Sequence, residues 1–189
     1  RAAEKPLHKD PFRLALLFLL METISKSSWL IPGMQTIRPA FLAFNFCILY
    51  VLIKPKQSLD PKTLTYRVPR LIIAQIVLAC GSAVFGLSIG GSAFFIINSY
   101  WKTIAFALLL IASIRGLADV RRMVKAAVIA TSILAFLSVF VFHVSKEGGT
   151  GAYDANDVGL IMVISIPLIL LLLQTNKGRW RVFCYVALL

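Results

Sequence analysis

Long apolar runs separated by short polar stretches dominate this chain. A membrane-spanning helix needs about 20 consecutive, mostly apolar residues. Backbone inside a bilayer must satisfy its own hydrogen bonds, which favours helices for such runs. The pattern therefore predicts an all-α fold, a polytopic transmembrane helical bundle with six complete spans and a truncated seventh. The predicted spans are residues 12–31, 37–53, 68–89, 94–114, 124–144 and 158–173, and the seventh starts near Trp180.

The composition agrees with a membrane protein. Of the 189 residues, 59% are hydrophobic, above the roughly 45–50% that is typical of soluble domains. The formal net charge is +12. Because the basic residues flank the apolar runs, this charge points to membrane topology and to contact with a lipid bilayer, with no nucleic acid partner. The three cysteines lie singly inside apolar runs, so we expect no disulfide and no metal site. We also expect no cofactor.

The basic residues also predict an orientation. Most lysines and arginines fall in the N-terminal tail, between spans two and three, between spans four and five, or after span six. These stretches share one side of an alternating topology, and the positive-inside rule makes that side cytoplasmic. The N-terminus is therefore predicted to be cytoplasmic, and the short connection at Gly90 and Gly91 to face outward.

We interpret residues 1–189 as a single transmembrane domain. The chain begins at Arg1 rather than at a methionine, and it ends at Leu189 inside the apolar stretch "WRVFCYVALL". We therefore expect it to be the N-terminal part of a longer membrane protein.

A polar cluster precedes the sixth predicted span. Asp154, Asn156 and Asp157 follow a glycine-rich segment, "GGTG", and lead directly into the apolar run. The Asp-x-x-Asp spacing resembles a capping box, and negative charge suits a helix N-terminus. The alternative is a binding role, because carboxylates and amides bind sugar hydroxyls and a carboxylate can act as a general base.

Four basic residues break the positive-inside pattern: Lys26, Arg38, Lys102 and Lys146. Each is predicted to lie toward the outer side of the membrane, and charges within spans are usually paired or functional. Snorkelling would explain Arg38 and Lys146, and pairing with Glu22 four residues earlier would explain Lys26. The functional alternative is that Lys102, with Arg38, binds the pyrophosphate of a lipid-linked donor. This requires spans one, two, four and six to converge at their outer ends.

Three stretches carry a resemblance to a known family. The segment "GGTGAYDANDVGLIMVISIPLILLLL" resembles the O-antigen ligase and polysaccharide polymerase superfamily, in which a glycine-containing outer loop leads into Asp-Pro-Asn-Asp and an apolar helix with a proline. The family's aspartate, asparagine and aspartate fall on Asp154, Asn156 and Asp157, and its proline is replaced by Ala155. The stretches "LALLFLLMETISKSSWLIPGMQTIRPAFLAF" and "YWKTIAFALLLIASIRGLADVRRMVKAAVIATSIL" are also similar to that family.

The resemblance implies a multi-pass glycosyltransferase of the bacterial inner membrane. Such enzymes move a glycan from undecaprenyl pyrophosphate to an acceptor glycan, lipid or protein at the periplasmic face, without a metal. Their main catalytic arginine and histidine lie in a large external loop of the C-terminal half, so the catalytic residues are expected beyond residue 189. For this function we expect the substrate-binding residues to be Lys26, Arg38, Lys102, Lys146, Asp154, Asn156 and Asp157.

Two other functions fit the pattern. The chain could be a non-catalytic integral membrane subunit with partners in a larger complex. It could also belong to a transporter, which would place ionisable residues near mid-membrane. Glu22 is the one acidic candidate at that depth in the sequence, and Lys26 four residues later would neutralise it locally. We therefore rank transport third, after the glycosyltransferase and the non-catalytic subunit.

Overall fold

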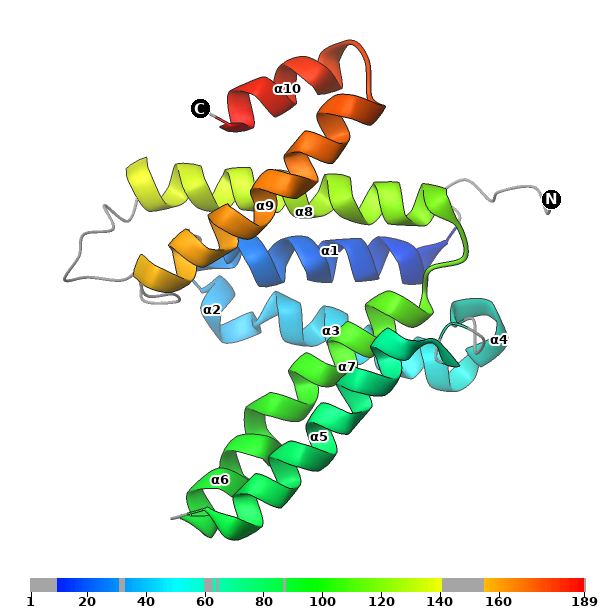
Figure 1. The fold of residues 1–189 in the computed structure, drawn as a ribbon, viewed down its shortest axis with the longest axis vertical. Helices are drawn as coiled ribbons and strands as arrows, with labels where there is room; N and C mark the ends of the chain where they lie inside the picture. The colour runs from blue at the N-terminus through cyan, green and yellow to red at the C-terminus, as the bar shows by residue number, and fades with distance from the viewer. Residues whose placement is uncertain are drawn as a thin grey trace. The chain divides into compact units, whose positions relative to one another are not determined.

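A computed structural model of the chain describes residues 10–30, 33–59, 63, 65–86, 88–140 and 155–188. All of the regular elements in these ranges are helical (Figure 1). The α-helices are α1 (Pro11–Ser25), α2 (Met34–Ile37), α3 (Pro39–Ile53), α4 (Pro55–Ser58), α5 (Arg67–Phe85), α6 (Ile89–Phe95), α7 (Trp101–Ala112), α8 (Leu117–Phe140), α9 (Ala155–Thr175) and α10 (Arg179–Leu188). A 3₁₀ turn, η2 (Ser27–Leu30), follows α1, and a π-helical turn, η4 (Ile96–Tyr100), joins α6 to α7.

The described residues contain four helices that are long and apolar enough to cross a membrane, which indicates a helical membrane protein. They are Arg67–Phe85, Ile89–Ala112, Leu117–Phe140 and Asn156–Thr175. The other two predicted spans correspond to α1 and α3, which have 15 residues each. At 1.5 Å per residue each covers about 22 Å, short of the roughly 30 Å hydrocarbon core. The structure therefore supports four of the six predicted spans by length and composition.

Two predicted boundaries were wrong. Gly90 and Gly91 lie inside α6 rather than in a loop, because Ser88 caps the helix two residues earlier by accepting a hydrogen bond from the Gly91 N–H (3.3 Å). Helix α8 begins at Leu117, so most of the predicted basic loop is helical. Arginine and lysine are good helix formers, and the helix continues past the end of the apolar run.

The helices form two compact units, and each is described by itself. Unit 1 contains Arg1–Cys47 and Ala118–Leu189, and unit 2 contains Ile48–Leu117. In unit 1, one face of α1 is buried through side chains at positions i, i+4 and i+7, which is the spacing of a single helix stripe. These side chains belong to Phe12, Leu16 and Leu19.

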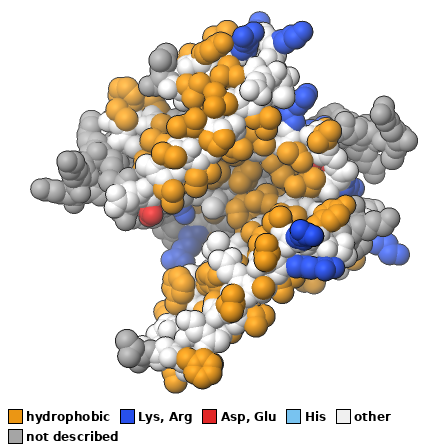
Figure 2. Space-filling model, viewed as in Figure 1, with side chains coloured by type: hydrophobic (Ala, Val, Ile, Leu, Met, Phe, Trp, Pro, Cys, Tyr) orange, Lys and Arg blue, Asp and Glu red, His pale blue; other side chains and the backbone are white. Residues whose placement is uncertain are grey.

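A second part of the core of unit 1 joins α8, α9 and α10. Val128 of α8, Ile169 and Leu172 of α9, and Cys184 of α10 are all buried and packed together. Gly178, with φ of 65°, supports the turn between α9 and α10, because glycine adopts positive φ without steric strain. Figure 2 shows that apolar side chains also cover much of the visible surface, as a lipid-facing protein requires.

An ion-pair network joins the first turns of α1 and α8 in unit 1. The Arg13 guanidinium lies 2.8 Å from the Asp119 carboxylate and 3.3 Å from the Asp10 carboxylate. Arg122 lies 3.3 Å from the same Asp119 oxygen. Figure 1 shows α1 and α8 side by side with their first turns at the same end, so the two helices run in the same direction.

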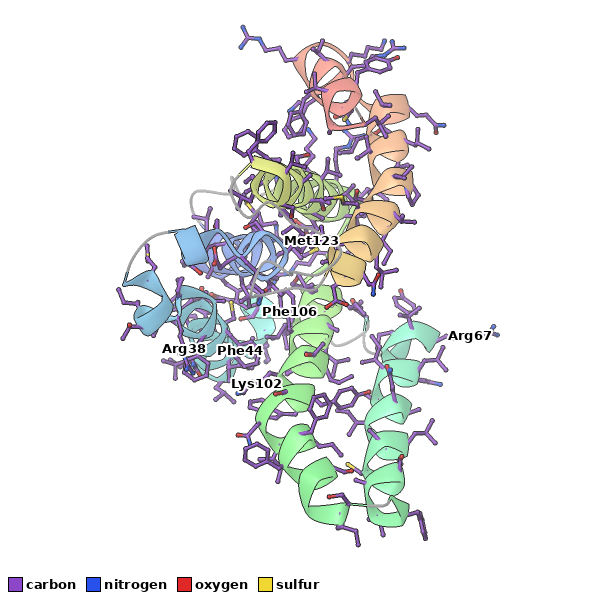
Figure 3. All side chains as sticks on the ribbon, turned by 90° about the vertical axis from the view of Figure 1, so that its left-hand side faces the viewer. Arg38, Phe44, Arg67, Lys102, Phe106 and Met123 are labelled. Atoms are coloured by element: carbon purple, nitrogen blue, oxygen red, sulfur yellow. The ribbon has the colours of Figure 1, made fainter. Side chains whose placement is uncertain are left out.

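Unit 2 is built around a helical hairpin. Helix α5 packs along α6 and α7, and the two arms lie side by side in both ribbon views (Figures 1 and 3). Arg67 stands at the start of α5 and Lys102 near the start of α7 (Figure 3). The Arg115 guanidinium, just after α7, donates to the carbonyl of Gln57 in α4. The connections that follow α3 and α7 therefore meet.

Candidate anion-binding site at the end of α1

The end of α1 is shaped by a buried carboxylate. Glu22 is 5% exposed. One of its oxygens accepts a hydrogen bond from the Ser27 hydroxyl at 2.7 Å, and the other accepts from the Ser28 N–H at 3.0 Å. These bonds draw the chain back over the last turn of α1, so the helix stops at Ser25 instead of continuing through the apolar run.

Lys26 occupies the first position beyond that helix in a left-handed conformation. Its φ is 52°, and its N–H donates to the Glu22 carbonyl at 2.9 Å. A side chain in this region of backbone space costs about 1–2 kcal/mol, which is why glycine usually fills such helix ends. Lys26 therefore has a strained backbone conformation.

Arg38 repeats this backbone arrangement at the end of α2. Its φ is 51°, and its N–H donates to the Met34 carbonyl at 3.0 Å. Among the residues with described backbone, Lys26 and Arg38 are the two that combine a side chain with positive φ. Strained backbone tends to persist at functional sites, where it sets the direction of a side chain.

Both cations line the same cleft. The cleft lies in unit 1, where α1, α2 and the start of α3 meet, and has a volume of about 450 Å³. Arg38 is exposed and stands where α2 gives way to α3 (Figure 3). The lining residues are Glu22, Lys26, Ser28, Met34, Arg38, Pro39, Ala40 and Phe41.

The chemistry of this cleft suits an anion. An ammonium and a guanidinium supply charge-assisted donors, which bind phosphate about twice as strongly as neutral donors do. The guanidinium adds a planar fork that matches phosphate oxygens. Glu22 also lines the cleft, but both of its oxygens accept hydrogen bonds from the Ser27–Ser28 turn. A simpler explanation is that each cation stabilises the negative end of a helix dipole, by about 0.3–1 kcal/mol.

The structure brings two predicted site residues, Lys26 and Arg38, together. Lys26 lies beyond the last residue of α1 rather than inside a span, and Glu22 lies in the last turn of that helix. This correction follows from the early end of α1. The transporter alternative stays a prediction.

Lys102 is the second residue of α7, in unit 2, and its side chain is partly buried. Its predicted convergence with the other three spans stays a prediction. Lys146 and Asp154 lie outside the described residues, so the predicted capping box stays a prediction as well.

Asn156 and Asp157 are exposed in the first turn of α9. The core of unit 1 packs the later part of α9 against the first half of α8, as Leu172 with Val128 shows. Because α8 runs parallel to α1, the start of α9 lies toward the end at which α1 finishes (Figure 1).

Sequence reasoning missed two features. One is the role of Glu22, for which the signal was the serine pair that follows it in "ETISKSS". The other is the network around Asp119, whose partner Arg13 lies 106 residues earlier in the sequence, too far for a local pattern to reveal.

Comparison with known proteins finds no match to a family model, a curated protein or a solved structure. The resemblance to the ligase and polymerase superfamily therefore stays a prediction. Within the described residues, no three histidine, cysteine, aspartate or glutamate side chains gather where they could hold a metal ion.

Proposed function

We propose that this chain is part of a bacterial inner-membrane glycosyltransferase of the O-antigen ligase kind, and that its cleft binds the pyrophosphate of a polyprenyl-linked glycan donor. One observation carries the proposal. Lys26 and Arg38 come from two separate helix ends and line one cleft, and each has a left-handed backbone conformation that glycine usually occupies.

In this function the two cations bind the pyrophosphate of the donor. When the glycan leaves, negative charge develops on the pyrophosphate oxygen that carried it, and fixed cations stabilise that charge. The exposed Asn156 and Asp157, at the start of α9, would contact hydroxyl groups of the donor or acceptor sugar. The group that activates the acceptor is not assigned among the described residues.

The proposal includes an N-terminus on the cytoplasmic side and six crossings. Two contacts support this topology. Helices α1 and α8 run parallel, with Arg13 and Asp119 paired at their starts, as expected for helices separated by three crossings. The bond from Arg115 to Gln57 joins two connections that two crossings separate. A cysteine at exposed Lys56 should resist external labelling in intact cells, and efficient labelling there would contradict the topology.

The test of function is donor binding by the full protein in lipid nanodiscs. We expect Lys26→Gln and Arg38→Gln each to weaken undecaprenyl pyrophosphate binding roughly tenfold or more, because each removes a charge-assisted contact. Lys56→Gln, an exposed position on α4, is the matched control and should bind normally. Unchanged affinity in both cleft variants would leave the two cations as helix caps.

A non-catalytic membrane subunit is the alternative. It is favoured by the long apolar helices α5 and Ile89–Ala112, whose side chains are mostly exposed and could meet partner helices. The two functions differ in one measurement. Glycan transfer by the purified full protein alone supports the enzyme, and transfer that needs an added membrane protein supports the subunit.

A further inference from the structure

Basic side chains gather where α9 turns into α10 in unit 1. Helix α9 is long and apolar enough to cross a membrane and ends at Thr175. A crossing by α9 places the turn that follows at the level of the lipid headgroups. Lys177 in that turn, and Arg179 and Arg181 in the first turn of α10, are all exposed. Figure 2 shows lysine and arginine side chains at its upper edge, over this turn.

A cation–π contact holds the start of α10 against α8. The Lys125 ammonium of α8 lies 4.3 Å from the centre of the Trp180 ring. One helical turn later, Val128 of α8 and Cys184 of α10 are buried in the same core cluster. These two layers of contact fix the first turn of α10, and Lys125 adds a fourth positive charge beside it.

The acidic residues in the described part of unit 1 do not offset this charge. Asp10 and Asp119 both contact Arg13, and the Glu22 carboxylate accepts hydrogen bonds from the serine turn after α1. Asp157 lies in the first turn of α9, at the opposite end of that 21-residue helix. The described surface around the start of α10 is therefore positively charged.

The outward face of α10 changes from basic to apolar along the helix. Val182 and Val186 follow Arg179 at i+3 and i+7, which places them on one face, and each is 64% exposed. On the neighbouring stripe, the Arg181 guanidinium lies 3.4 Å from the Tyr185 hydroxyl. Tyrosine is enriched where membrane proteins meet the headgroups. Positive charge and exposed apolar surface therefore follow each other on one helix.

This sequence of surfaces matches the chemistry of an anionic phospholipid. Its phosphate suits the forked donors of two arginines, and its acyl chains suit the valines that follow. A soluble acidic partner would meet the charge but leave both valines in water. A partner helix would cover the valines but bring no anion to the arginines.

We propose that the start of α10 binds an anionic glycerophospholipid, with the phosphate against Arg179 and Arg181 and an acyl chain along Val182 and Val186. Lys125 and Trp180 are positioning residues, because they hold this turn against α8. The site is separate from the cleft at the end of α1 and does not depend on the proposed glycosyltransferase function.

The experiment measures binding to the full protein in detergent by native mass spectrometry. The probes are dioleoylphosphatidylglycerol, the neutral dioleoylphosphatidylcholine with the same chains, and glycerol 1-phosphate as a headgroup without chains. The test variant combines Arg179→Gln with Arg181→Gln. The matched control combines Arg67→Gln with Arg70→Gln, which removes two exposed arginines from the first turn of another membrane-length helix, α5. A third variant replaces Arg179 and Arg181 by lysine and keeps their charge.

We expect the test variant to bind phosphatidylglycerol at least about tenfold more weakly, because two basic residues that face the anionic headgroup are lost. The control should bind it as the unaltered protein does, and the lysine variant should keep most of the affinity. If the test variant fails to fold, Arg179→Gln alone decides.

Three results would overturn the assignment. An equal loss in the test variant and the control would mean that net charge alone attracts the lipid. Equal binding of phosphatidylcholine and phosphatidylglycerol by the unaltered protein would remove the role of the arginines. Binding of glycerol 1-phosphate as tight as that of the lipid would remove the role of the valine face.

Discussion

The two ends of α1 carry two charged regions with different designs. At its start, Asp10, Arg13, Asp119 and Arg122 form a network in which acids and bases contact each other directly. At its end, the cleft gathers two cations in strained backbone, and hydrogen bonds from serines hold the nearby carboxylate.

This difference indicates that the network stabilises helix packing, whereas the cleft is suited to binding a ligand. The network sits between helices, with the Asp119 side chain only 8% exposed. A buried charge contact of this kind fixes how two helices pack, and removing one partner leaves an uncompensated buried charge. The cleft is open, and its exposed Arg38 can meet a ligand from outside the chain. Substitutions at the two ends should therefore affect different measurements.

The largest expected effect is on stability, at the network. Asp119→Asn removes the carboxylate that contacts both Arg13 and Arg122, and we expect the free energy of unfolding to fall by about 2–3 kcal/mol. Thermal unfolding of the purified protein in detergent, followed by circular dichroism, measures it. Arg121→Gln, an exposed neighbour on α8, should stay within about 0.5 kcal/mol of the unaltered protein. Equal melting temperatures for the two variants would show that the network does not hold α1 to α8.

Glu22→Ala is expected to have an intermediate effect on stability. The direction of its effect on pyrophosphate affinity tests whether Glu22 positions the cleft. The variant loses the bonds to Ser27 and Ser28, so we expect a loss of about 1–2 kcal/mol in stability. Removing a negative charge from a cationic cleft should by itself strengthen anion binding. If Glu22 positions the turn that carries Lys26, pyrophosphate affinity falls instead, and titration of the folded variant should show that fall. A rise in affinity would mean that the carboxylate merely opposes the anion.

The smallest effect on stability is expected at the strained positions themselves. Glycine tolerates positive φ, and its own entropic cost of about 0.5–1 kcal/mol offsets part of the relief. Arg38→Gly should therefore unfold within about 1 kcal/mol of the unaltered protein and be more stable than Arg38→Ala, which keeps the strained side-chain geometry. Both should bind pyrophosphate more weakly, as Arg38→Gln does. A glycine variant less stable than the alanine variant would show that the backbone is not strained there.

The helical class and the membrane setting could be read from the sequence because both depend on local composition. A long apolar run such as 158–173 has few alternatives to a helix in lipid, and it appears as α9. Helix ends were harder to predict. The end of α1 depends on one carboxylate reaching two serines, and the start of α8 depends on a helix that continues beyond its apolar run.

The sequence by itself marked Lys26 and Arg38, together with Lys102 and Lys146, as exceptions to the charge distribution of the predicted topology. Only the tertiary structure placed Lys26 and Arg38 in one cleft and paired Arg13 with Asp119. Lys26 and Arg38 are 12 positions apart in the chain, and Arg13 and Asp119 are 106 positions apart. Contacts at such separations depend on how helices turn back and pack, and no pattern of neighbouring residues encodes that.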